Sequence, residues 1–153
     1  MTMFPAGEYN GLPFIFGGSF MAAWEDAPDL MELAAKVIAA REEVAHVEVD
    51  QVLFLRELET KPPALARCYR FHTHPIGFFS EKPWGIVFYW MNCDYMSQEQ
   101  LALLMFHELL HIPPTGNKLI QHDVQDFRQV LGIDLDWSEP GREVPKILGV
   151  MNL

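Results

Sequence analysis

Basic residues are scarce in this sequence of 153 residues, which contains 11 Lys and Arg against 21 Asp and Glu. The formal net charge of -10 at pH 7 opposes binding to any partner that is recognised through its phosphates, because such binding depends on cationic side chains. The composition therefore argues against a protein that binds nucleic acid or an anionic membrane.

Cysteines and long apolar runs are few as well. Cys68 and Cys93 are the two cysteines, and they lack the close spacing of paired metal ligands, so we expect buried thiols and no disulfide. No apolar run approaches the roughly 18 residues of a transmembrane helix. The opening stretch carries Glu8, no Lys or Arg, and several Pro and Gly, unlike a signal peptide. These features predict a cytoplasmic protein.

Hydrophobic residues make up 50% of the chain, which is typical of a globular protein, and no repeat or linker divides it. We therefore expect one domain over residues 1–153. Glycines and prolines interrupt both ends, so we expect an irregular apolar segment over residues 1–28 and an irregular tail over residues 133–153.

Apolar residues recur with helical or strand-like spacing in separate segments. Helical spacing predicts an amphipathic helix over residues 30–43, with Asp29 as its N-cap. Strand-like runs follow at residues 47–58, 66–74 and 85–92. The last run is almost wholly apolar, which is typical of a strand covered on both faces.

A second helix is predicted with a well-marked start. Ser97 is its N-cap and Gln100, three residues later, completes a capping box. Its body is apolar nearly all round, so it should run through the interior, and the prolines at 113 and 114 should end it at about His111. A further helix is predicted over residues 118–131.

The motif H-E-x-x-H lies on this buried helix, formed by His107, Glu108 and His111. A separation of four residues places both imidazoles on one face, where their nitrogens can share one ion at about 2.0 to 2.1 Å. Glu108 lies about 100° around the helix, where its carboxylate can reach a metal-bound water without becoming a ligand. Zinc makes such a water acidic, and the carboxylate takes its proton and passes it to the leaving amine.

An accidental match to this motif is the alternative, in which the histidines are ordinary core residues. The apolar surroundings favour the metal, because two imidazoles and a carboxylate in a buried helix need partners and one dication supplies them all. The sequence therefore predicts one Zn²⁺ per chain.

A catalytic zinc site usually has three protein ligands, so one more must come from elsewhere in the chain. We favour His122, because the prolines and the turn at Gly116 let the chain reverse towards the helix end. A surface histidine is the alternative. Asp123 and Asp126 are rival ligands, but they fit better as acceptors that orient an imidazole N–H.

The segment from Met105 to Phe127, which contains HELLHIPPTGNKLIQHDVQDF, resembles the active-site region of the phage-type metallopeptidases and, more distantly, of the SprT-like zinc peptidases. Both are minimal members of the zincin group. The resemblance implies an α+β fold with an N-terminal helix, a small mixed three-stranded sheet, a buried active-site helix and a following ligand-bearing helix. It also implies that His107, His111 and His122 bind zinc and that Glu108 is the base.

Other candidates are less specific. His72 and His74 share one face of a predicted strand, where they could form a second metal pair or contact substrate, although surface histidines are common there. Tyr69, Tyr89 and Tyr95 are possible hydrogen-bond donors to an oxyanion, but each also fits an ordinary packing role.

The leading prediction is a zinc-dependent metallopeptidase that acts on a peptide or protein substrate and binds neither nucleic acid nor membrane. One alternative is a non-catalytic zinc-containing binding or regulatory module that acts through the apolar N-terminal segment. The other is a three-histidine metal-dependent ribonuclease, which resembles the bacterial ribosomal-RNA-maturing family in its His-Asp pair at His122 and Asp123. That family has no glutamate at the position of Glu108, and the net charge of -10 is unfavourable for RNA.

Overall fold

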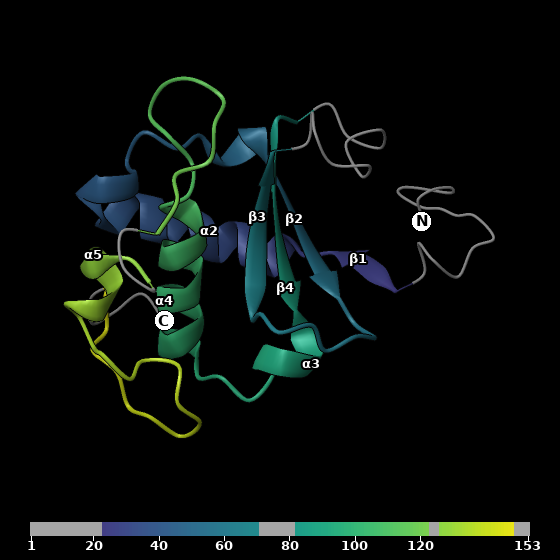
Figure 1. The fold of residues 1–153 in the computed structure, drawn as a ribbon, viewed down its shortest axis with the longest axis vertical. Coiled ribbons are helices and arrows are strands. Elements are labelled where there is room, and N and C mark those ends of the chain that lie inside the picture. The colour runs from purple at the N-terminus through teal and green to yellow at the C-terminus, as the bar shows by residue number, and fades with distance from the viewer. Residues whose placement is uncertain (1–22, 71–81, 123–125, 149–153) are drawn as a thin grey trace.

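The structure, a computed structural model, describes residues 23–70, 82–122 and 126–148 (Figure 1). The elements in chain order are β1 (Trp24–Asp26), α2 (Pro28–Ala40), the 3-10 helices η1 (Glu42–Val44) and η2 (Val49–Gln51), β2 (Val52–Glu57), β3 (Ala66–Arg70), β4 (Trp84–Tyr89), α3 (Trp90–Cys93), α4 (Gln98–Leu109) and α5 (Arg128–Leu131). The fold is α+β, as predicted. None of the described helices is long and apolar enough to cross a bilayer.

The sheet is mixed and has four strands in the order β1-β2-β4-β3. The central strands β2 and β4 are parallel, whereas β1 and β3 pair antiparallel with them at the two edges. The predicted three-stranded sheet was wrong by one strand, because β1 lies within residues 1–28, which we expected to be irregular. A strand of three residues is too short to show alternation in the sequence.

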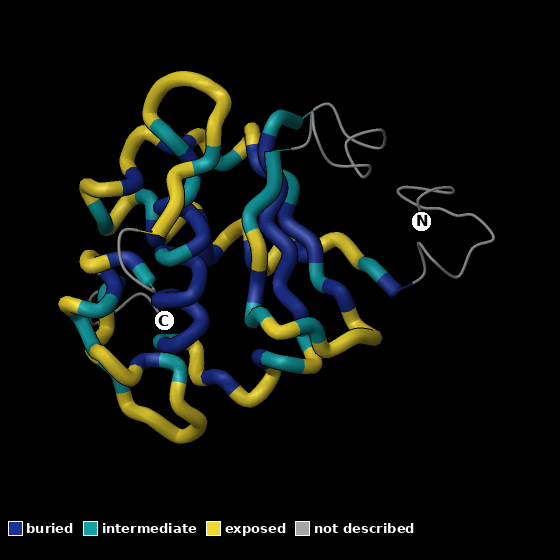
Figure 2. Tube along the Cα trace, in the orientation of Figure 1, coloured by how far each residue is buried: buried dark blue, intermediate teal, exposed yellow. Residues whose placement is uncertain are grey.

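The main core lies between one face of the sheet and the helices α2 and α4 (Figures 1 and 2). All six residues of β4 are buried, as predicted for a strand covered on both faces. Its side chains alternate: Ile86 and Phe88 join the helices in the main core, while Val87 and Tyr89 form a smaller cluster with Leu55 on the opposite face.

Helix α2 begins two residues earlier than predicted, and Asp29 is not its N-cap. The N-cap is Ala27, which makes no side-chain hydrogen bond, and Pro28 occupies the first turn. Proline suits this position because its φ is already helical and its missing N–H has no partner there. The Asp29 carboxylate instead accepts a hydrogen bond from Arg56 of β2, which connects α2 to the sheet.

Helix α4 has the predicted capping box. Ser97 Oγ accepts from the Gln100 backbone N–H at 3.1 Å, and Gln100 Oε1 accepts from the Ser97 N–H at 3.0 Å. The helix ends at Leu109, so His107 lies in its last turn and His111 lies just beyond it.

The predicted helix over residues 118–131 was wrong: within the described part of this range, residues 118–122 and 126–131, only Arg128–Leu131 are helical. Residues 118–122 are not helical, because the backbone of Ile120 pairs with an earlier part of the chain. Its N–H donates to the His111 carbonyl at 2.8 Å, and its carbonyl accepts from His111 Nδ1 at 2.7 Å. These bonds, between residues nine positions apart, replace the helical bonds that Ile120 would otherwise make.

Candidate metal centre

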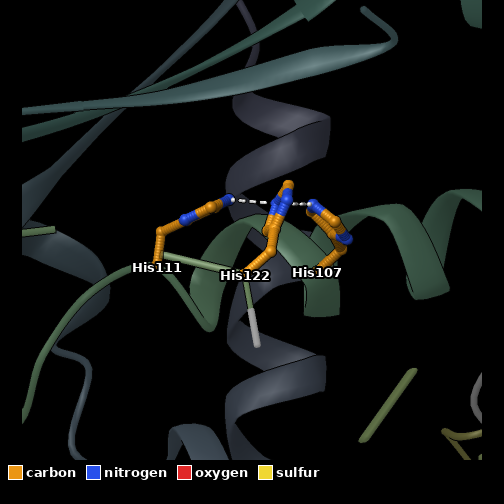
Figure 3. Close-up of side chains that lie close together, drawn as sticks. All are labelled: His107, His111 and His122. Atoms are coloured by element: carbon orange, nitrogen blue, oxygen red, sulfur yellow. Dashed lines mark hydrogen bonds between the residues drawn. The ribbon is translucent and has the colours of Figure 1, made fainter. Parts of the chain in front are cut away.

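Three histidines converge beside the C-terminal end of α4 (Figure 3). His122 Nε2 lies 3.0 Å from His107 Nε2 and 3.2 Å from His111 Nε2. Two nitrogens that bind one ion tetrahedrally at about 2.0 to 2.1 Å lie about 3.3 Å apart. The separations around His122 are therefore close to those of ligands that share a metal ion.

The chain segment after α4 carries His122 back to the helix. Gly116 has a φ of 84°, a conformation that glycine adopts without the penalty that other residues incur. The two hydrogen bonds between Ile120 and His111 then fix the returning segment alongside the end of α4. The same bonds orient the His111 ring, so one short segment positions two of the three imidazoles.

Hydrogen bonding determines which ring nitrogens carry lone pairs. The Ile120 carbonyl can only accept, so His111 Nδ1 carries the proton and its Nε2 presents a lone pair. His107 Nδ1 lies 2.5 Å from Asp126 Oδ1 and donates to that carboxylate in the same way. Two lone pairs thus point towards His122 Nε2, which can donate to only one of them at a time. A cation satisfies all three nitrogens, so the arrangement fits a metal ion.

The electrostatics differ between the two helix histidines. Burial lowers the pKa of His111 to about 4, so its ring is neutral at neutral pH. Burial also acts to lower the pKa of His107, but its hydrogen bond to Asp126 and the charges of Glu108 and Asp126 outweigh this effect, and the pKa of His107 is raised. An anionic partner that strengthens a histidine as a base also strengthens it as a metal ligand.

Asp126 accepts three hydrogen bonds. Oδ1 accepts from His107 Nδ1 and from the Phe127 N–H at 2.6 Å, and Oδ2 accepts from Trp137 Nε1 at 3.0 Å. Burial alone would raise the pKa of Asp126. The three hydrogen bonds and the charge of His107 together lower this pKa by more, so the net shift is downward. The sequence predicted Asp126 as an acceptor that orients an imidazole N–H, and in the structure that imidazole is His107.

Glu108 is buried, with 3% of its surface exposed. Its Oε1 makes no hydrogen bond with the described residues, and its Oε2 lies 4.0 Å from His107 Nε2. Burial raises the pKa of Glu108 to about 7, although the His107 charge opposes the shift. A buried carboxylate without a partner is costly, and a cation beside the three imidazoles would offset that cost.

Two residues that the sequence reasoning missed complete the surroundings. The Phe127 ring packs edge-on against all three imidazoles, with centroid distances of 5.3, 5.0 and 5.1 Å to His107, His111 and His122. The other is Trp137, the donor to Asp126. Its only signal in the sequence is that it is the one aromatic residue of the tail over residues 133–153.

The tyrosine candidates lie away from the three histidines. The Tyr95 hydroxyl donates to the Ser138 carbonyl at 2.6 Å, so it is engaged with the C-terminal segment. The hydroxyls of Tyr69 and Tyr89 bond to each other at 2.7 Å within the cluster on the sheet face opposite to α4. The predicted candidates His72, His74 and Asp123 lie outside the described residues.

The fold and the site together define a small α+β protein with a three-histidine cluster that can hold a metal ion. The chain belongs to the family described as "Putative phage metallopeptidase", whose sequence model matches residues 22–149. No curated protein and no solved structure was found to match the chain. The family implies a metal, and the His107, His111 and His122 cluster is a place in the structure that can hold it.

Proposed function

We propose that the protein is a zinc-dependent metallopeptidase, in which His107, His111 and His122 hold the ion and Glu108 is the general base. The observation that carries this proposal is the buried carboxylate of Glu108 next to three convergent imidazoles: its Oε2 lies 4.0 Å from His107 Nε2, and its Oε1 has no hydrogen-bond partner among the described residues. The groups that support the proposal come from the last turn of α4, the turn that follows it and one returning segment.

Zinc, when bound, supplies a positive charge that polarises a peptide carbonyl and makes water acidic near pH 7. Glu108 accepts the proton from the attacking water at a carboxylate oxygen and delivers it to the leaving amine nitrogen. Its burial favours this role, because the raised pKa of Glu108 makes the carboxylate a stronger base than an exposed one. The unpaired Oε1 also has no competing donor to displace.

The proposed substrate is a peptide or protein in the cytoplasm, rather than a nucleic acid or a membrane. Strand β3 is the edge of the sheet next to α4, and its outer side has no neighbouring strand in the described residues. An extended peptide can pair with such an edge through its main chain. We propose that substrate binds along β3, within reach of the metal centre.

The test combines metal analysis with turnover. About one zinc per chain by mass spectrometry, largely lost in His122→Ala, is expected if the three histidines are the ligands. Glu108→Gln should keep the metal and lose turnover of a peptide library by roughly a hundredfold or more. Glu57→Gln is the matched control, since Glu57 is also buried, with 4% exposed, but lies at the end of β2.

A binding module with a structural zinc is the remaining alternative, and the same variant separates it from the peptidase. Such a module should bind its partner equally well after Glu108→Gln, whereas a peptidase should lose its activity. Absence of metal from the wild type, even after zinc is supplied, would refute both. The family match favours the peptidase over the ribonuclease.

A further inference from the structure

Trp137 is the one large aromatic side chain of the C-terminal segment that follows α5 in the described residues. It is buried, with 6% exposed, although its neighbours Asp136 and Ser138 are not. Its ring centroid lies 6.3 Å from that of His107, and its indole N–H donates to Asp126 Oδ2 at 3.0 Å. The indole nitrogen can only donate, so Trp137 is the donor and Asp126 the acceptor in this hydrogen bond.

The two oxygens of Asp126 have separate donors. On the Oδ1 side the donors are His107 Nδ1 and the adjacent backbone N–H of Phe127, and on the Oδ2 side the donor is Trp137. The terminal torsion of an aspartate is soft, so a carboxylate anchored at one oxygen can turn. The bond to Trp137 anchors the second oxygen and thereby sets the plane of the carboxylate that faces His107.

Trp137 is itself fixed to the helix that carries the histidines. The Gln100 side chain, 1% exposed, donates from Nε2 to the Trp137 carbonyl at 2.9 Å and to the Glu139 carbonyl at 2.7 Å. Its Oε1 accepts from the Ser97 N–H in the capping box. Helix α4 is therefore linked to the C-terminal segment at two places. Gln100, near the start of the helix, bonds to the segment directly, and His107, near the end of the helix, is linked to Trp137 through Asp126.

We propose that Trp137 is a positioning residue for the metal centre: its indole N–H fixes the Asp126 carboxylate, which in turn directs the His107 Nε2 lone pair at the ion. This inference rests on the metal-binding part of the proposed function and is independent of the peptidase chemistry. Trp137 itself touches neither the ion nor the substrate. It gives the C-terminal segment a role in metal affinity.

The test is the zinc affinity of Trp137→Phe, measured by competition with a chromophoric chelator. Phenylalanine keeps an aromatic ring and removes the N–H. Loss of the direct partner of a metal ligand weakens binding about ten- to a hundredfold, and Trp137 acts one step further out, through Asp126, so we expect the lower end of this range, about tenfold. Trp90→Phe is the control, because Trp90 lies on α3 beneath Arg56, at 4.3 Å, and makes no described contact with the three histidines. Thermal unfolding of both variants reports whether they remain folded.

A double variant separates positioning from general packing. If Trp137 acts through Asp126, Trp137→Phe should change affinity little when added to Asp126→Asn, whereas independent packing effects should add. Cobalt-loaded Trp137→Phe should also show an altered visible spectrum, because the ligand geometry around the ion changes.

A measurement on the wild type covers the case in which the variant does not fold. The indole N–H resonance of Trp137 should shift when zinc binds, and that of Trp90 should not. An unchanged Trp137 resonance, or an affinity of folded Trp137→Phe within twofold of wild type, overturns the inference while leaving the three-histidine site intact. A wild type that binds no zinc overturns the proposed function and this inference together.

Discussion

Replacing Glu108 with glutamine should stabilise the metal-free protein while it removes the proposed base. The carboxylate is buried with 3% exposed, and its Oε1 has no hydrogen-bond partner among the described residues. Burial therefore raises the pKa of Glu108 to about 7 from an ordinary 4.5. A neutral amide of the same shape does not carry the cost of an uncompensated charge.

The sign and size of the stability change follow from the difference in proton binding between the folded and the unfolded chain. Above pH 4.5 the unfolded chain loses the Glu108 proton, whereas the folded chain keeps it until about pH 7, so stability falls as the pH rises through this window. At about 1.4 kcal/mol per pKa unit, the loss reaches about 3 kcal/mol above pH 7. Glutamine does not titrate, so the advantage of the variant should grow from near zero at pH 4.5 to this value.

Urea denaturation of chelator-treated protein between pH 4.5 and 8 measures the difference directly. In thermal unfolding the same gain corresponds to roughly 6 to 12 °C for a protein of this size. Glu57→Gln is the control: its Oε1 accepts from the Thr60 N–H at 3.1 Å and the Thr60 hydroxyl at 2.8 Å, so removing its charge should bring no gain. A Glu108→Gln gain that is absent at pH 8, or equal at both ends of the range, would refute the reasoning.

Three further predictions concern metal affinity. Asp126→Asn should weaken zinc binding about ten- to a hundredfold in chelator competition, because an amide cannot accept from donors on both sides; unchanged affinity would exclude Asp126 as an orienting group. Because the pKa of His107 is raised while that of His111 is about 4, zinc affinity should fall by at least about tenfold per pH unit below the His107 pKa, and a titration that is flat from pH 8 to 5 contradicts this. Gly116→Ala, at a φ of 84°, should cost about 1 kcal/mol in urea denaturation and weaken zinc binding, whereas Gly141→Ala, at 78°, should cost as much but leave affinity unchanged.

The parts of the fold that depend on local signals could be predicted from the sequence. The Ser97 and Gln100 capping box lies within four consecutive residues, and the bonds that form it are the ones the pattern implies. The apolar run that became β4 was recognisable because no polar residue interrupts its buried length. Two of the three histidines are four residues apart, so their proximity was expected from helical spacing, although the helix itself ends at Leu109 and His111 lies in the following turn.

The parts that failed depend on contacts between distant residues. The helix predicted over residues 118–131 was displaced by the pairing of Ile120 with His111, which no periodicity within that segment reveals. Asp29 is a residue type that commonly caps helices, yet its carboxylate forms an ion pair with Arg56, which lies far along the chain on β2. Trp137 was overlooked because its importance arises from a bond to Asp126 and not from any motif.

This division between local and distant contacts also explains why the H-E-x-x-H motif alone is not a complete site. The end of α4 and the turn that follows it bring His107 and His111 close together, as their four-residue spacing predicts. The position of His122 and the orientation of the His107 ring depend instead on two other segments that reach the end of α4. The segment with Ile120 carries His122, and the other orients His107 through Asp126. A change in either segment can therefore abolish metal binding while α4 stays intact. Affinity measured across variants of both segments, and not the presence of the motif, is the property that distinguishes a working centre from an accidental match.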